Sequence, residues 1–263
     1  MTNVRRTIGV IGGSGITEIF DGVESTLHEV ATPWGAPSGP IREGKVGNLK
    51  ILFLPRHGPG HSIPPHRVNY RANVDALRAL GAEAIVTVSS VGSLQPDLPP
   101  GTFVLPSQFV DLTKQRPTTF FDGGKVYHVS LADPFCPDLT RAAVMMGDAA
   151  GTPFVPGKTY VCVEGPRFST RAESKYFRSF ADVIGMTLVP EVTLARERGL
   201  CYLCLAMVTD FDVWAERPVD ARTIAEVVRR NSTRMRSTLS LLLPRLDGPI
   251  ECACARALDD AAL

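Results

Sequence analysis

Two short segments of this sequence carry groups suited to binding an anion, and each directly follows an apolar run. Gly12-Gly13-Ser14-Gly15 offers backbone N–H groups that glycines leave accessible, and Ser14 adds a hydroxyl donor. It lacks the lysine of a Walker loop and the third glycine of the dinucleotide fingerprint, so a tight turn remains the alternative. Ser89 and Ser90 follow the run at 84–88, where a plain polar turn is equally compatible on local grounds.

Arg56 and His57 end a further apolar run, at 49–54. The planar guanidinium of Arg56 suits phosphate oxygens, and ligands of open α/β sheets gather at the carboxyl ends of strands. His57, His61 and His66 lie close together in the sequence, so a metal site is an alternative. The segment is rich in Gly and Pro and has no acidic ligand nearby, which favours an anion site without metal.

The segment Glu164–Glu173 could present an aromatic ring to a ligand. Ser169 or Thr170 could cap a following helix, with Glu173 near capping-box spacing. That arrangement leaves Phe168 at a loop tip, where its face could stack on a base. A place in the core is the alternative for this phenylalanine.

Two carboxylates, Asp210 and Asp212, follow the most apolar run of the chain. They are costly there unless they bind something, and a metal pair, a cap and a ligand contact all remain open. Met186 and Thr187 stand at another junction of strand and helix, where methionine usually fills gaps in packing. Polar groups at so many strand exits predict a ligand site at one edge of a sheet.

The elements that would position these residues alternate along the chain. Expected strands cover 7–11, 49–54, 84–89, 103–105, 160–163, 183–188 and 202–209, and expected helices cover 68–80, 137–149, 171–181, 191–198 and 221–243. Several strands are continuously apolar, as strands covered on both faces are. We therefore expect an α/β fold with helices around a largely buried sheet, covering residues 1–246, followed by a tail at 247–263.

The composition narrows the classes of protein. A formal net charge of +1 over 263 residues gives no broad footprint for nucleic acid or an anionic membrane. No apolar run is long enough to span a bilayer, and Gly-Gly-Ser-Gly interrupts any signal sequence, so we expect a cytoplasmic protein. No zinc-binding spacing of cysteines appears. Cys252 and Cys254 stand in the polar tail, as two free surface thiols, as a disulfide with each other, or paired with other thiols.

Eight motifs in order resemble the trimeric purine nucleoside phosphorylase family, and specifically its methylthioadenosine phosphorylase branch. They are GVIGGSG, LPRHG, VNYRAN, VGSL, ADPFCP, EGPRFSTRAE, GMTLVPE and LAMVTDFDVW. The resemblance implies a single α/β domain with a central mixed sheet, a homo-oligomer (a trimer or a dimer of trimers), and no metal or organic cofactor. Inorganic phosphate is implied as a co-substrate of a nucleoside.

The resemblance also implies a set of site residues. The phosphate site would comprise Ser14, Arg56, His57, Ser89, Ser90 and Thr187. The purine site would comprise Phe168, Ser169, Asp210 and Asp212. Met186 would lie beneath the ribose, with His61 in the ribose and 5'-group set, and His128 would reach the nucleoside of a neighbouring subunit. Asp210, Arg56 and His57 would be the catalytic residues.

The reaction implied is phosphorolysis of a purine nucleoside through an oxocarbenium-like sugar. Relatives that act on 6-oxopurines generally have Glu after the loop Phe, and Asn in the strand-end motif. This chain has Ser169 and Asp210 at these positions, and carboxylates can accept hydrogen bonds from the amino group of adenine. Gly185 departs from the Asn of some relatives, and Val91 from a Cys.

The predicted function is therefore cleavage of a 6-aminopurine nucleoside, 5'-methylthioadenosine first, into adenine and 5-methylthioribose 1-phosphate. A phosphorylase of broader specificity, for adenosine, inosine, guanosine or methylthioinosine, is the alternative. A nucleoside-binding sensor is the non-enzyme alternative, which Arg56, His57 and Asp210 disfavour because a sensor needs no phosphate site. A nicotinamide oxidoreductase is a distant third, since the glycine fingerprint fails.

Overall fold

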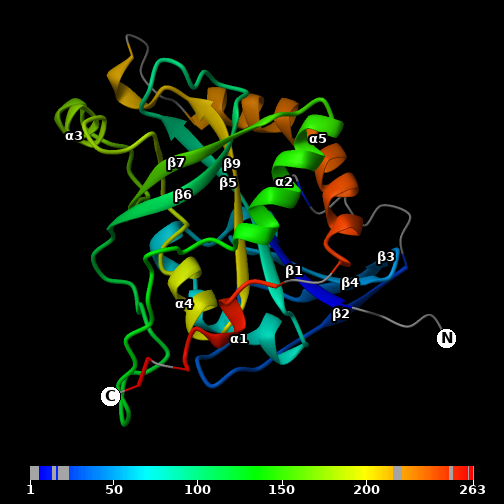
Figure 1. Ribbon diagram of the computed structural model, residues 1–263. Helices are drawn as coiled ribbons and strands as arrows, with labels where there is room; N and C mark the ends of the chain where they lie inside the picture. The colour runs from blue at the N-terminus through cyan, green and yellow to red at the C-terminus, as the bar shows by residue number, and fades with distance from the viewer. Residues whose placement is uncertain are drawn as a thin grey trace.

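The computed structural model describes residues 6–13, 16, 24–215, 221–248, 251–259 and 261–262. Within them, nine strands form one sheet. The strands are β1 (Arg6–Gly12), β2 (Ser25–His28), β3 (Ile41–Val46), β4 (Leu49–Pro55), β5 (Ala84–Ser93), β6 (Phe103–Leu112), β7 (Phe154–Val163), β8 (Val183–Gly185) and β9 (Cys201–Asp210). The helices are α1 (Tyr70–Ala79), α2 (Pro137–Ala149), α3 (Arg171–Phe177), α4 (Glu191–Glu197) and α5 (Ala221–Arg245), with the short 3₁₀ turns η2 (Pro59–His61), η3 (Pro65–Arg67), η4 (Asp212–Trp214) and η5 (Cys254–Arg256) (Figure 1).

The strand order is β2-β3-β4-β1-β5-β8-β7-β6-β9, and β5 also pairs with β9. This extra pairing closes β5, β8, β7, β6 and β9 into a ring, from which β1 to β4 extend as an open sheet. β1 lies parallel to β4 and β5, and β5 lies parallel to β9, so four carboxyl ends share one edge. β8 runs antiparallel to β5, so the chain leaving β8 runs back along β5 toward Ser89. The predicted single α/β domain with a mixed sheet is confirmed.

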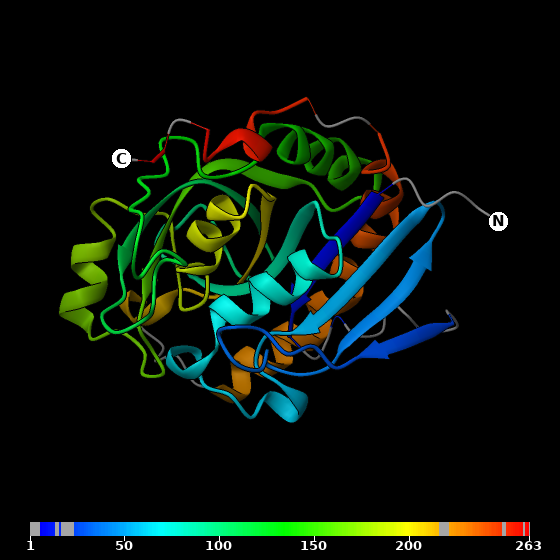
Figure 2. The same ribbon diagram turned by 90° about the horizontal axis from the view of Figure 1, so that it is seen from below.

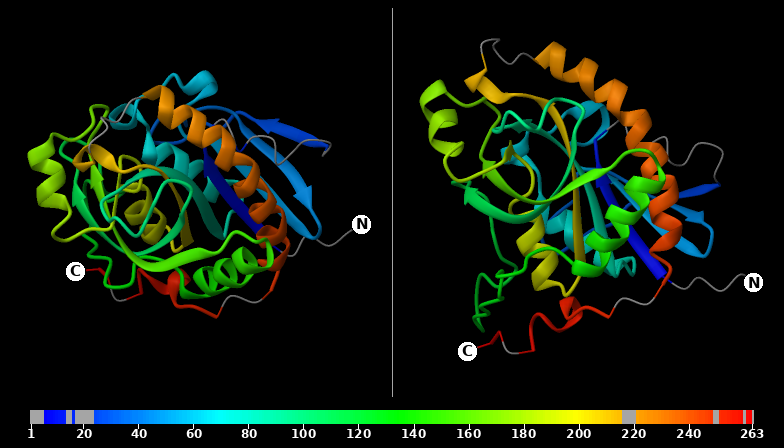
Figure 3. Two further views of the ribbon diagram at one scale, coloured as in Figure 1. Left: turned by 90° about the horizontal axis from the view of Figure 1, so that it is seen from above. Right: turned by 45° about the horizontal axis from the view of Figure 1, so that its top comes forward.

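Alternate residues of β5 and β9 face two separate cores. Ile85 and Tyr202 pack on the side of α1 and α4, whereas Val86 and Leu203 pack on the side of α2 and α5. Figure 2 shows α1 and α4 in front of the sheet, and the left view of Figure 3 shows α5 on the opposite side. Because helices cover both faces, these strands are apolar at successive positions, as the sequence predicts.

The helix boundaries follow local capping chemistry. Thr170 caps α3, and Glu173 bonds back to the Thr170 backbone, which completes the predicted capping box. The Asn69 side chain accepts a hydrogen bond from the Ala72 N–H at the start of α1. α2 has the predicted bounds, because Pro137 stands at its first position.

Several strand predictions differ from the structure. Strands β2 and β3 were not predicted, since β2 is largely exposed and β3 contains Arg42, Glu43 and Lys45. β6 and β7 are longer than expected, because they pair with each other along their whole lengths, including their less apolar residues. α3 is shorter than the expected 171–181, and β8 ends at Gly185 instead of 188. No helix in the described ranges has the length and apolar character needed to cross a membrane.

Candidate active site

Arg56, at the end of β4, is held by a buried partner that the sequence analysis missed. Its Nε donates to Glu191 Oε2 at 2.9 Å, and Nη2 donates to Glu191 Oε1 at 3.1 Å and to Thr87 Oγ1. Nη1 donates to the Val88 carbonyl at 3.1 Å. Among the described residues, these bonds leave one N–H of Nη1 for another partner.

Glu191 is fully buried at the first position of α4, and it also accepts a hydrogen bond from the Tyr202 hydroxyl at 2.8 Å. Burial acts against the charged guanidinium, but the Glu191 carboxylate outweighs it and raises the pKa of Arg56. The signal in the sequence was a carboxylate next to Pro190 at the start of an apolar helix. The pair fixes the guanidinium of Arg56 where β1 and β4 end, beside the middle of β5.

His57 is a buried neutral imidazole. Its Nδ1 lies 2.8 Å from the Ile63 carbonyl, which can only accept, so Nδ1 carries the proton and Nε2 is an acceptor. Burial, followed by the charge of Arg56, lowers the pKa of His57 from 6.5 to about 4. Its ring stacks on the exposed ring of His61, with centroids 4.2 Å apart. His57, His61 and His66 do not gather into a set of metal ligands in the described part of the chain.

Three hydroxyl groups meet where the segment that follows β8 passes the carboxyl half of β5. Ser89 Oγ lies 3.1 Å from Thr187 Oγ1 and 3.3 Å from the Tyr160 hydroxyl, and all three residues are buried. Ser90 is exposed between buried neighbours of β5. The structure thus brings together Ser89 and Thr187, which come from distant parts of the sequence, and adds Tyr160, which the sequence analysis did not single out.

Gly185 fits this cluster only because it has no side chain. A Cβ there would lie 1.9 Å from the Tyr160 hydroxyl oxygen. Tyr160 therefore fills the space next to Gly185. Gly185 is the position at which some relatives are expected to carry Asn. Since the Tyr160 hydroxyl also contacts Ser89, this pair connects the departure at Gly185 to the hydroxyl cluster.

Asp210 ends β9, and its carboxylate is only partly satisfied by the protein. Thr209 Oγ1 donates to Oδ1 at 2.7 Å, and the Asp212 N–H donates to Oδ2 at 3.0 Å. Burial raises the pKa of Asp210 despite these bonds. A Cβ on Gly92 would lie 3.0 Å from Asp210 Oδ2, so Gly92 keeps the space beside this carboxylate open.

Asp212 follows in the left-handed region, with φ of 45°, and is buried. Burial raises its pKa, while the nearby hydroxyls of Ser174 and Ser169 act in the opposite direction. Neither hydroxyl completes a hydrogen bond to Oδ2, which has no partner among the described residues. A buried carboxylate oxygen in strained backbone with no partner indicates a ligand contact.

The loop before α3 brings Phe168 and Ser169 to the same side of the molecule as Asp212. Phe168 is exposed, Ser169 lies near the Asp212 carboxylate, and Arg171 donates to the Val213 carbonyl at 3.1 Å. The expectation of Phe168 at a loop tip is confirmed, and a core position is excluded.

Met186 lies against the same loop, where a Cβ on Gly165 would come within 2.5 Å of its sulfur. Arg116, which the sequence analysis missed, holds the two segments together. Its guanidinium is buried and donates to the carbonyls of Glu164, Met186 and Val189, at 2.6, 2.8 and 2.6 Å. A lone arginine in a loop gave no signal in the sequence.

The remaining predicted site residues are Ser14 and His128. Ser14 lies outside the described residues. His128 is exposed on the segment that pairs with the C-terminus, where its N–H donates to the Ala261 carbonyl at 2.7 Å. That end of the molecule is opposite α3 (Figure 1), so His128 is not part of the cluster formed by its own chain.

Residues 7–244 match the sequence profile of the Phosphorylase superfamily. The chain belongs to this superfamily. It is 50% identical over 257 residues to the S-methyl-5'-thioadenosine phosphorylase of Thermofilum pendens, which covers 97% of this chain and 98% of the relative. The enzyme of the same name from Nitrosopumilus maritimus is 46% identical over 255 residues, 97% of either chain.

Solved structures agree with this membership of the superfamily. A methylthioadenosine phosphorylase from an antarctic soil metagenomic library superposes with a TM-score of 0.92 at 39% identity, covering 100% of this chain and 93% of the other. A Schistosoma mansoni methylthioadenosine phosphorylase in complex with adenine gives a TM-score of 0.90 at 36% identity, covering 97% and 96%. The family predicted from the eight sequence motifs is confirmed.

Proposed function

We propose that the chain cleaves 5'-methylthioadenosine with inorganic phosphate, releasing adenine and 5-methylthioribose 1-phosphate. The observation that carries the proposal is the carboxylate pair Asp210 and Asp212, with raised pKa values and one oxygen without a partner among the described residues. Its relatives of nearly equal length are named as phosphorylases of this nucleoside.

The base would contact the Asp210 and Asp212 end of the site. Adenine offers an amino donor, and the free Oδ2 of Asp212 can accept from it. Because burial raises the pKa of Asp210, this carboxyl can hold a proton and donate it toward N7 as the base leaves. The exposed ring of Phe168 can stack on the purine, beside Ser169.

Phosphate would bind at the hydroxyl end of the site. Ser89 and Thr187 supply hydroxyl donors, and exposed Ser90 stands in the same strand. Arg56 supplies positive charge and one N–H, and neutral His57 adds no charge of its own near pH 7. Ser14 would complete this set. An anion held there faces the developing positive charge of the sugar, which is a positioning and electrostatic role.

The sugar would lie between the two ends, over Met186 and near His61. We further propose a homo-oligomer, a trimer or a dimer of trimers, in which His128 of one subunit approaches the 5' group bound by its neighbour. The exposure of His128, away from its own site, is compatible with such a role. The proposed reaction uses phosphate as co-substrate and requires no metal or organic cofactor.

Turnover of three nucleosides tests the proposal: methylthioadenosine, adenosine and inosine, each with and without phosphate. We expect adenine from methylthioadenosine only when phosphate is present, with inosine the poorest substrate. Equal turnover in water would make the enzyme a hydrolase, and a preference for inosine would contradict the roles of Ser169 and Asp210. A preference for adenosine over methylthioadenosine would instead support the broader-specificity alternative. Binding without turnover would support a sensor.

A further inference from the structure

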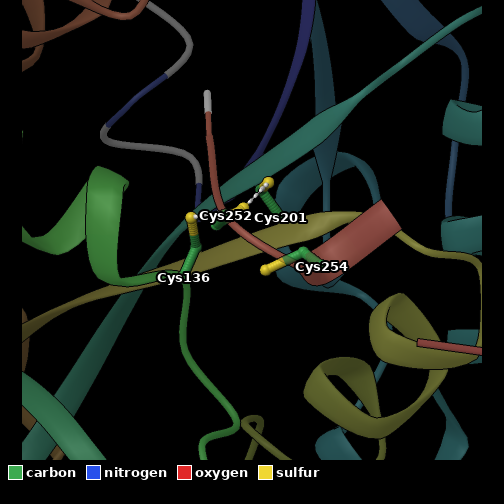
Figure 4. A group of neighbouring side chains, drawn as sticks. All are labelled: Cys136, Cys201, Cys252 and Cys254. Carbon is green, nitrogen blue, oxygen red and sulfur yellow. Dashed lines mark hydrogen bonds between the residues drawn. The ribbon is translucent and has the colours of Figure 1, made fainter. Parts of the chain in front are cut away.

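Four cysteines that are far apart in the sequence come together at the end of the molecule opposite the proposed site. The sulfurs of Cys136, Cys201, Cys252 and Cys254 all lie within 4.8 Å of one another (Figure 4). Cys136 directly precedes α2, Cys201 begins β9, and Cys252 and Cys254 belong to the C-terminal segment. Cys136, Cys201 and Cys254 are buried, and Cys252 is half-buried. The expectation that Cys252 and Cys254 are two free surface thiols is therefore wrong about the surface.

Backbone hydrogen bonds hold the positions from which these thiols extend. The Cys136 N–H donates to the Tyr202 carbonyl at 2.9 Å, and the Cys201 N–H donates to the Glu83 carbonyl at 3.1 Å. The C-terminal segment is attached beside them, since the Glu251 N–H donates to the Asp138 carboxylate at 2.8 Å. The four thiols are thus presented by a preformed frame instead of by one mobile loop.

The spacing of the sulfurs matches a tetrahedral metal site. Zinc bound to thiolates has Zn–S bonds of about 2.3 Å, which places the sulfurs of a tetrahedron about 3.8 Å apart. Cys252 Sγ lies 3.5 Å from Cys136 Sγ and 3.3 Å from Cys201 Sγ, and all four sulfurs lie within 4.8 Å of one another. These separations are close to the tetrahedral edge, so shifts of a few tenths of an ångström to about one ångström would give it.

No pair of these cysteines is bonded in the structure, where all six cysteines of the chain are free. Pairing them as disulfides would require an oxidant, which the proposed reaction does not supply. The Cys252 thiol instead hydrogen-bonds with the thiols of Cys136 and Cys201. Cysteine side chains gathered in this way can bind a soft divalent cation once they lose their protons to it.

We propose that Cys136, Cys201, Cys252 and Cys254 bind one Zn²⁺ per chain as four thiolates. Binding replaces the thiol protons, which are released to solvent, and no oxidation takes place. Four protein ligands leave no open position, so the ion is structural and fastens the C-terminal segment to α2 and β9. The proposal does not depend on the proposed function, because the ten-residue strand β9 separates Cys201 from Asp210 by roughly 30 Å.

The proposal departs from the sequence-based expectation of no metal. That expectation considered the spacing of cysteines along the chain, and a pair such as Cys252 and Cys254 gives only half of a site. The other two ligands become neighbours only after α2 and β9 have packed. Cys162 and Cys204 are buried outside the cluster and serve as internal controls.

Co²⁺ binding to the untagged full-length chain, reduced and stripped of metal, tests the proposal. We expect one Co²⁺ per chain, with the sulfur-to-metal charge-transfer band and the strong visible absorption of a tetrahedral thiolate site, displaced by stoichiometric Zn²⁺. Cys252→Ser and Cys254→Ser should abolish this spectrum. Cys204→Ala is the matched control on β9, facing the other core, and should retain it.

Loss of the spectrum in Cys204→Ala as well, or a reduced wild-type chain that binds neither ion, would overturn the proposal. Mass spectrometry of the alkylated wild-type protein, without reductant, provides a measurement that needs no variant. Elemental zinc with four protected thiols supports the site, whereas disulfides among the four cysteines and no zinc would overturn it. Phosphorolysis measured in parallel should persist after metal removal at ambient temperature, so failure of one proposal is distinguishable from failure of the other.

Discussion

The two ends of the proposed site differ in whether their polar side chains already have hydrogen-bond partners within the protein. On the phosphate side, Arg56 has bonds to Glu191, Thr87 and Val88, and Ser89 bonds with Thr187. On the base side, Asp212 Oδ2 has no partner in the described chain, and both carboxyls have raised pKa values. The phosphate side is therefore a rigid, preformed anion site, whereas the base side gains its full set of bonds only with a ligand.

Removing the proton of the base side should have the largest effect. Asp210→Asn keeps the size of the side chain but cannot protonate N7, and we expect kcat for methylthioadenosine to fall about 10²- to 10⁴-fold. Steady-state kinetics check this, with Asp212→Asn as the matched control. The control should act mainly on KM, because it alters a contact to the amino group. Equal losses of kcat in both variants would contradict a special role for Asp210.

Breaking the phosphate-side pair should instead show as lost stability. Glu191→Ala leaves the buried Arg56 charge without its partner, which costs about 3–5 kcal/mol of unfolding free energy. Urea unfolding of the two proteins measures it. Arg167→Ala removes the exposed partner of Glu173 in a surface ion pair and should cost far less. Similar costs for the two variants would show that the Arg56 pair is not a rigid element.

The two sides should respond to pH in opposite directions. Below pH 6.5 the unfolded chain protonates the imidazole of His57, whereas the folded chain does so only near pH 4. The contribution of neutral His57 to the free energy of unfolding is therefore fully present above pH 6.5. It falls by about 3 kcal/mol as the pH falls to about 4. The carboxyls of Asp210 and Asp212, with raised pKa values, favour the folded state at low pH and lose that contribution as pH rises. Urea unfolding between pH 7 and 4 should show a slope that His57→Gln reduces; an unchanged slope would contradict this account of His57.

The close packing of Gly185 against Tyr160 can be tested by adding one methyl group. Gly185→Ala places a Cβ against the Tyr160 hydroxyl and should cost about 1–3 kcal/mol by overpacking. Adding Tyr160→Phe removes the oxygen in the closest contact and should restore part of the loss. Thermal unfolding of both single variants and the double variant measures the coupling. Independent, additive effects would mean that Tyr160 does not limit the residue at Gly185.

Much of this arrangement could be predicted from the sequence, and the omissions share a physical cause. Continuous apolar runs revealed β1, β4, β5 and β9, and the strand exits indicated Asp210 and Arg56, because local pattern reports burial. Glu191 and Arg116 were missed, since each acts through partners far away in the sequence. The cysteine cluster was missed for the same reason. Strand β2, with its exposed side chains, carries no hydrophobic signal at all.

The closed ring of strands also determines the order in which parts of the chain can fold. Ala84 of β5 pairs with Cys201 of β9, and β6, β7 and β8, which complete the ring, lie between them in the chain. Closing such a long loop costs conformational entropy before the contacts that stabilise it can form, and folds dominated by distant pairings form slowly. Residues in the carboxyl halves of β5 and β9, including Ser89 and Asp210, can reach their final positions only when that pairing forms. The edge that carries the proposed site should therefore be among the last parts of a newly made chain to fold.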